Sequence, residues 1–158
     1  MFSNPVNTQK SDSKEARNVS FLGSAMHSMD AKKRVIIPSK YREDLGNVFY
    51  VTRKFDPCLA IYTEEEWASF LDKLEKLPDS VAADAQEYLL CFAQKCIPDS
   101  SGRIILEDKL LEHAHIKKNL VFVGAGRQLK IWSEELWEER EKNRECEKMR
   151  AVLQDFGL

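Results

Sequence analysis

Short runs of β-branched and aliphatic residues alternate with amphipathic segments along the first half of the chain. The composition of residues 21–29, 35–37, 48–52 and 58–62 is typical of strands, and the first of these is expected at a sheet edge. A short helix is predicted over residues 39–45, between the second and third strands. The first half therefore predicts a strand-rich unit with one small helix inside it.

Two longer helices are predicted after the fourth strand. Thr63 and Glu66 have the spacing of a capping box, and apolar residues recur at helical intervals over residues 67–77. Pro78 ends this helix, and a second helix is predicted over residues 79–93. Apolar stripes of this kind are mostly packing surfaces, so we expect both helices to cover the core or to contact another subunit.

The second half repeats this order of elements. Strands are predicted over residues 104–106, 120–123 and 129–132, with a short helix after the first of them. The glycine-containing segment 124–126 is followed directly by a strand, so it favours a hairpin turn over a phosphate-binding loop. Ser133 is placed to cap a final acidic helix that carries a late apolar stripe.

Individual residues recur together with the elements. Asp30 and Arg34 reappear 69 residues later as Asp99 and Arg103, and each arginine opens a short aliphatic strand. A second match, around Trp67, recurs 70 residues later. Two matches in the same order predict two copies of one fold with small loop insertions. A module of about fifty residues buries little core alone, so the copies are expected to pack on each other or on other subunits.

The first copy of the repeated motif concentrates positive charge at a turn. Asp30 favours a turn because its carboxylate can accept bonds from nearby backbone N–H groups, and Lys32, Lys33 and Arg34 follow it. Such a charged tip is suited to contact an anionic partner. An arginine can bind a guanine edge or a phosphate through two parallel hydrogen bonds. The alternative is that Arg34 pairs with Asp30 as a local brace of the turn.

Charge is segregated along the chain although its net value is only −2. Residues 30–54 contain seven Lys or Arg against three Asp or Glu, whereas residues 64–87 contain eight acids against two lysines. A protein with one basic face suits an oriented encounter with a polyanion. The alternative is that both segments are ordinary solvated surface.

Several classes of protein have little support in this sequence. No apolar run reaches the roughly 18 residues needed to span a membrane and no signal peptide is recognisable, so a cytoplasmic protein is expected. The four cysteines lack CxxC spacing and are expected to be buried, reduced thiols. A zinc site using His113 and His115 would have no spacing signature, and we expect no metal or other cofactor. Catalytic motifs are absent, so neither enzyme activity nor a small-molecule substrate is expected.

Motifs spread over about residues 21–140 occur in one order and at consistent separations. They are Asp30-x-Lys32-x-Arg34, Asp99-x-x-Gly102-Arg103, the segment 27–30 before the first motif, residues 57–62 with Glu66-Trp67, and the closing segment 131–133. Together these motifs resemble the MraZ family.

The resemblance implies an α+β, mainly β fold with a pseudo-two-fold internal repeat. Two tandem swapped-hairpin β-barrel modules of the SpoVT/AbrB type are expected, with flanking helices. The implied division is a disordered extension over residues 1–20, modules over 21–77 and 95–140, a connecting helix over 78–94 and a C-terminal helix over 141–158.

The resemblance also implies a function. Members of the family form ring-shaped homo-oligomers and bind double-stranded DNA at short direct repeats in the promoter of the division and cell-wall gene cluster, including their own promoter. A nucleoid-associated regulator of transcription is therefore expected. The implied DNA-binding residues are the two arginines, the two aspartates that order the tips and the neighbouring basic residues: Arg34, Arg103, Asp30, Asp99, Lys32, Lys33, Lys40 and Arg42.

Two departures from the family pattern affect these expectations. Lys33 stands where the family has glycine, and at a position with positive φ a lysine costs roughly 1 kcal/mol. Leu111 stands where the first module has Arg42, so the basic surface of the second module is expected to be thinner.

The alternative function is a non-enzymatic interaction or scaffold module that uses its acidic amphipathic helices. Salt dependence separates the two functions, because binding to DNA phosphates falls steeply with salt.

Overall fold

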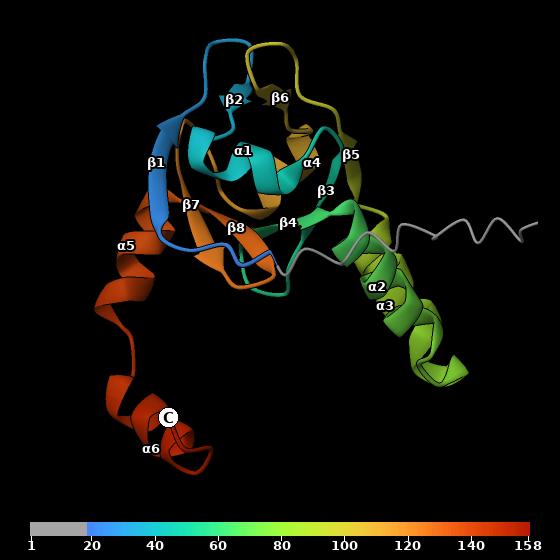
Figure 1. Cartoon of the computed structure of the whole chain (residues 1–158), viewed down its shortest axis with the longest axis vertical. Helices are drawn as coiled ribbons and strands as arrows, with labels where there is room; N and C mark the ends of the chain where they lie inside the picture. The colour runs from blue at the N-terminus through green and yellow to red at the C-terminus, as the bar shows by residue number, and fades with distance from the viewer. Residues whose placement is uncertain (1–18) are drawn as a thin grey trace, which may run out of the picture.

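The computed structural model describes residues 19–158 (Figure 1), so nearly all of the predicted disordered extension lies outside the described residues. Apart from an unpredicted strand, Gln94–Cys96, and the division of the predicted final helix into two, strands and helices in the described part of the chain follow the predicted order. They are β1 (Ser24–Ser28), β2 (Arg34–Ile36), α1 (Ser39–Leu45), β3 (Phe49–Arg53), β4 (Leu59–Thr63), α2 (Glu64–Glu75), α3 (Asp79–Leu90), β5 (Gln94–Cys96), β6 (Arg103–Ile105), α4 (Asp108–His113), β7 (Asn119–Ala125), β8 (Gln128–Ser133), α5 (Glu134–Lys142) and α6 (Cys146–Gln154).

The strands form two antiparallel sheets in which the two halves of the chain are interleaved. The larger sheet has the order β1-β7-β8-β4-β3-β5, and β2 pairs with β6 in the smaller one. The first strand of each half therefore pairs with a strand of the other half. The α+β class and the packing of the copies on each other are confirmed. In residues 19–158, the pairings do not include a β1–β5 contact that would close the larger sheet into a barrel.

The register of two strand pairs reveals the pseudo-two-fold axis. Ala60 of β4 lies opposite Lys130 of β8, and these residues are equivalent in the two copies. Val35 of β2 lies opposite Ile104 of β6, which are equivalent as well. Each pair brings the same position of both copies to one point, as a two-fold relation requires.

The two halves share one main core between the sheets and the short helices. Val35 and Ile104 enter it from the smaller sheet, and Phe49 and Phe122 enter it from equivalent strands of the larger one. A smaller cluster under α2 contains Tyr62 and Trp67. The main core is therefore completed by both halves, whereas the smaller cluster is built from the first half and the helices that follow it.

Most predicted helix boundaries agree with the structure. Helix α1 covers the predicted residues, and the hydroxyl of Thr63 accepts a hydrogen bond from the backbone N–H of Glu66 (3.2 Å), so the predicted cap of α2 is confirmed. Helix α3 ends at Leu90, earlier than predicted, because the chain then enters β5. Strand β5 is short and polar, so it lacks the apolar run that marks a strand in a sequence.

The C-terminal region differs from the prediction of one final helix. The chain leaves helical geometry after Lys142 and begins a second helix at Cys146. No helix of the described part is long and apolar enough to cross a membrane.

Candidate nucleic-acid interface

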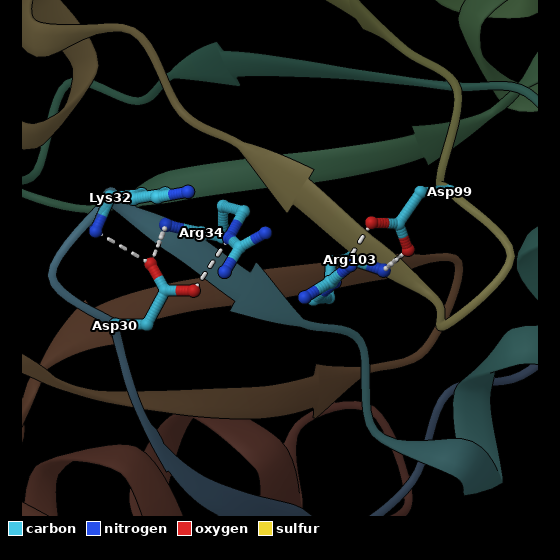
Figure 2. Close-up of polar contacts among 5 residues, drawn as sticks. All are labelled: Asp30, Lys32, Arg34, Asp99 and Arg103. Carbon is cyan, nitrogen blue, oxygen red and sulfur yellow. Dashed lines mark hydrogen bonds and ion pairs between the residues drawn. The ribbon is translucent and has the colours of Figure 1, made fainter.

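The β2·β6 pair, called the ribbon here, carries both predicted arginines on one face. Successive side chains of a strand point to opposite sides. Val35 and Ile104 accordingly point into the core, whereas Arg34, Arg103 and their cross-strand neighbours lie on the outer face. Arg34 lies opposite Ile105, and Arg103 lies opposite Ile36 by the two-fold relation. The two arginines are therefore diagonal neighbours on one exposed surface (Figure 2).

Two loops extend from this ribbon and lie side by side at one end of the molecule (Figure 1). Residues 30–34 are called tip 1 and residues 99–103 tip 2. In tip 1, the N–H of Lys33 donates to the carbonyl of Asp30 (3.0 Å), and the N–H of Asp30 donates to the carbonyl of Arg34 (3.0 Å). Tip 2 has the equivalent two bonds, at 2.9 and 3.0 Å. The tips are thus two copies of one tight turn.

The fourth residue of each tip has a left-handed backbone. Its φ is +60° at Lys33 and +77° at Gly102. A turn followed by a left-handed residue is a common three-residue hairpin loop, and that residue is usually glycine. The structure therefore confirms the positive φ that was considered for Lys33.

An aspartate organises each tip. One carboxylate oxygen of Asp30 accepts hydrogen bonds from the N–H groups of Lys32 and Arg34, both at 2.9 Å, and the other oxygen accepts from Arg34 Nε at 2.6 Å. Asp99 accepts the same bonds from Ser101 and Arg103 (Figure 2). The pairing that was the alternative interpretation of Arg34 is therefore present. It uses Nε only and leaves the four N–H groups of the terminal nitrogens for another acceptor.

These bonds keep both aspartates ionised. The backbone hydrogen bond from Arg34, followed by the side-chain bond from the same residue, lowers the pKa of Asp30 below its ordinary value. The backbone bond from Arg103 lowers the pKa of Asp99 in the same way. Each ionised carboxylate fixes the direction of its arginine, which projects from the ribbon with its outer edge available.

The remaining cations near the tips are distributed unequally. Lys32 is exposed on tip 1, and Lys33 Nζ pairs with Asp108 of α4 at 2.5 Å. At tip 2, Arg42 of α1 covers the backbone of Gly102, where an added Cβ would lie 2.6 Å from the Arg42 guanidinium carbon. Arg42 Nε donates to the carbonyl of Ile37 at 2.8 Å, which holds it in this position.

This placement corrects the expectation of a thinner basic surface in the second module. Because the halves are interleaved, Arg42 belongs to the first half but lies against tip 2, whereas Leu111 of the second half is buried beside tip 1. The basic residue is not missing from tip 2, since the other half supplies it.

Lys40 is not brought to the tips. Its Nζ donates to the carbonyl of Ser24 at 2.9 Å, at the start of β1, whereas the end of β1 leads into tip 1. Sequence reasoning also missed a cation near the ribbon. Lys95 of β5 borders a concavity together with both arginines. The only sequence signal for it is its place in the repeat, three residues before the Pro98-Asp99 step.

Cysteines and histidines do not form a second site in the described residues. No group of three or more His, Cys, Asp or Glu residues there could hold a metal ion. The four cysteines are free thiols. Burial raises the pKa of Cys58 to about 11 and that of Cys96 to about 12, so these two are protonated at neutral pH. Cys91 and Cys146 are exposed, contrary to the expectation of buried thiols.

The fold and the tips define a class of protein: an internally duplicated, interleaved α+β chain that presents two aspartate-oriented arginines on one ribbon. A family model described as "MraZ protein, putative antitoxin-like" matches residues 20–88 and again residues 89–155. The chain belongs to the MraZ family.

Curated relatives agree with this assignment. A protein of Lachnoclostridium phytofermentans is 39% identical over 139 residues, which cover 87% of this chain and 98% of that relative. Proteins of Thermoanaerobacter sp. (strain X514) and Ligilactobacillus salivarius are 42% and 44% identical, over 87% and 75% of this chain and 99% and 84% of their own lengths. All three are named "Transcriptional regulator MraZ". The relatives are thus named as regulators and not as enzymes, in agreement with the expectation that this protein is not an enzyme.

Proposed function

We propose that this protein is a transcriptional regulator that binds double-stranded DNA with the outer face of the β2·β6 ribbon. The observation that carries the proposal is the pair of arginines, Arg34 and Arg103. Each is held by its own aspartate, and the terminal nitrogens of each have no hydrogen bond to a residue in the range 19–158. The family relatives named as transcriptional regulators support the same function.

A two-stranded ribbon is narrow enough to enter the major groove of DNA. There, a guanidinium can form a bidentate pair with a guanine edge, which contributes about 1–3 kcal/mol of discrimination. Lys32 and Lys33 of tip 1 and Arg42 beside tip 2 flank the arginines on either side. These cations are suited to the phosphates of the two groove walls, since phosphate contacts position a protein without selecting a base.

One ribbon reads few bases, so specificity requires repetition. We propose that the chain assembles into a ring-shaped homo-oligomer that occupies direct repeats in the promoter of the division and cell-wall gene cluster, including its own promoter. Linked binding sites gain affinity when their spacing matches that of the DNA repeats. Helix α6 supports self-association because its apolar residues Met149, Val152 and Leu153 are partly exposed in the single chain.

The alternative function is an interaction or scaffold module that uses the acidic amphipathic helices. The two functions make different predictions about salt, because DNA binding should weaken with a log–log slope near −0.9 for each phosphate contact. Apolar helix packing should respond little to salt.

The test is fluorescence anisotropy of the DNA upstream of the gene against a scrambled duplex, over a salt series. The wild type should bind its own upstream DNA selectively. The double variant Arg34→Ala/Arg103→Ala should lose the selectivity. A matched control, Lys73→Ala/Arg127→Ala, removes one exposed cation of α2 and one of the turn between β7 and β8, outside the ribbon and α6, and should bind as the wild type does. Equal and negligible binding of both duplexes by the wild type would refute the DNA function.

A further inference from the structure

The ribbon alone cannot give the protein a direction on DNA. Arg34 and Arg103 are related by the pseudo-two-fold axis, as are the backbones of the two tips. A two-fold surface fits a DNA element equally well after a half-turn rotation. Direct repeats, however, require every subunit to bind in the same direction. The direction must therefore come from side chains that differ between the two halves.

One such difference lies on the strand that precedes each tip. Lys95 of β5 is exposed, and the equivalent position in β1 is Met26, which is 60% exposed. The two positions are matched in structure as well, because Lys95 lies opposite Tyr50 of β3 and Met26 lies opposite Val121 of β7, in equivalent strands. One flank of the ribbon therefore has a cation where the other has a thioether.

Lys95 lies at a concavity of about 320 Å³ between β5 and the ribbon. Arg34 and Arg103 line the same concavity, together with Asp99 and Ile105. The carboxylate of Asp99 is already occupied by Arg103 and by two backbone N–H groups. None of the hydrogen bonds or ion pairs within residues 19–158 involves the ammonium group of Lys95. The concavity thus holds three cations and one carboxylate whose charge is locally compensated.

We propose that this concavity binds one backbone phosphate of DNA through Lys95, and that this one-sided contact sets the direction of the chain on its element. The inference rests on the proposed DNA function. A lysine acts as a point charge toward phosphate, whereas Met26 on the other flank offers no such attraction. Rotating the DNA by half a turn would place the phosphate against Met26, so the two directions differ by this contact.

The first experiment compares Lys95→Met, which copies the other flank, with the wild type on the upstream duplex. For Lys95→Met, the slope of log affinity against log salt should be shallower than that of the wild type by about 0.9 for each subunit bound. The ratio of wild-type to variant affinity should therefore fall about 3-fold per contact between about 50 and 200 mM salt. The control Lys73→Met removes an exposed lysine of α2 and should leave the slope unchanged. Thermal melting of each variant checks that the fold is retained.

The second experiment places a neutral methylphosphonate at single backbone positions, in the same place of each repeat. For the wild type, neutralisation on one side of the element should weaken binding, and Lys95→Met should be insensitive there. In the exchange variant Met26→Lys/Lys95→Met, the sensitive position should move to the opposite side.

The inference would be overturned by an unchanged salt slope in Lys95→Met, or by a neutralisation pattern that is the same in all three proteins. In either case, selective DNA binding by the wild type would still uphold the proposed function. A wild type that binds no DNA would overturn both.

Discussion

The two tips have the same backbone and the same aspartate–arginine pairing, but they obtain their additional cation in different ways. At tip 1 the cation is Lys33, on the left-handed residue itself, and the neighbouring helix position is the apolar Leu111. At tip 2 the left-handed residue is Gly102, and the neighbouring helix supplies Arg42. Tip 1 therefore carries its additional cation on the left-handed residue and tip 2 on the neighbouring helix, and in each tip the other of these two positions is uncharged.

The difference shows that the side chains of the left-handed residue and of the neighbouring helix residue compete for the same space. A side chain on Gly102 would meet the guanidinium of Arg42, whereas Lys33 and the apolar Leu111 line one concavity and the ammonium group of Lys33 pairs with Asp108. The cost differs as well, because a lysine in the left-handed region is strained and a glycine is not. Tip 2 is accordingly the relaxed version of the turn and tip 1 the strained version.

The largest effect is expected when tip 2 is given the residue of tip 1. Gly102→Lys places a side chain at φ +77° and displaces Arg42, so the free energy of unfolding should fall by about 1–2 kcal/mol in urea denaturation. Adding Arg42→Leu reproduces the residue pair of tip 1 and should recover the part of the loss that comes from crowding. A Gly102→Lys protein as stable as the wild type would contradict the shared space.

The reverse exchange should have a smaller effect of opposite sign. Lys33→Gly relieves the strained backbone and should raise the free energy of unfolding by up to about 1 kcal/mol. The lost pair with Asp108 is exposed and offsets little of this gain. Asp108→Asn removes the pair alone and is the matched control. If Lys33→Gly were less stable than Asp108→Asn, tip 1 would not be strained.

The smallest expected difference between the tips concerns pH. Both aspartates have a pKa below their ordinary value of 3.8, so their stabilising bonds are fully present above that value and are lost as the pH falls through the lower, folded-state pKa. Asp30→Asn and Asp99→Asn should each destabilise the protein near neutral pH, and both deficits should shrink below about pH 4. Urea denaturation at pH 7, 5 and 3 measures this. Different pH profiles for the two variants would show that the tips are not electrostatically equivalent.

Most elements were predictable because their signals are local. The cap at Thr63 and the turn chemistry of Asp30 depend on hydrogen bonds between residues no more than four positions apart. Strand β5 was missed because its three residues have no apolar pattern and it forms only by pairing with β3. The break between α5 and α6 was missed because the apolar stripe of α6 looks continuous with the preceding helix.

Among the candidate residues, the tip positions followed from the sequence and the flanking ones did not. Asp30, Arg34, Asp99 and Arg103 lie where the repeated motif placed them. Lys40 instead binds the start of β1, as described above. Lys40 and Arg42 are two residues apart on a short helix, but their side chains bind different backbone carbonyls. The ammonium group of Lys40 binds the carbonyl of Ser24, and Nε of Arg42 binds the carbonyl of Ile37.

By itself, the sequence determined that the chain is duplicated and that each copy contains one aspartate–arginine turn. The left-handed φ that makes Lys33 a strained residue came from the structure. Only the tertiary structure decided which copy each element pairs with. The two copies have similar strands, so pairing within a copy and pairing between copies satisfy the same local pattern. Long-range packing favours pairing of β1 and β2 with strands of the other copy. This pairing brought both arginines onto one ribbon, Arg42 over the opposite tip and Lys95 to one flank.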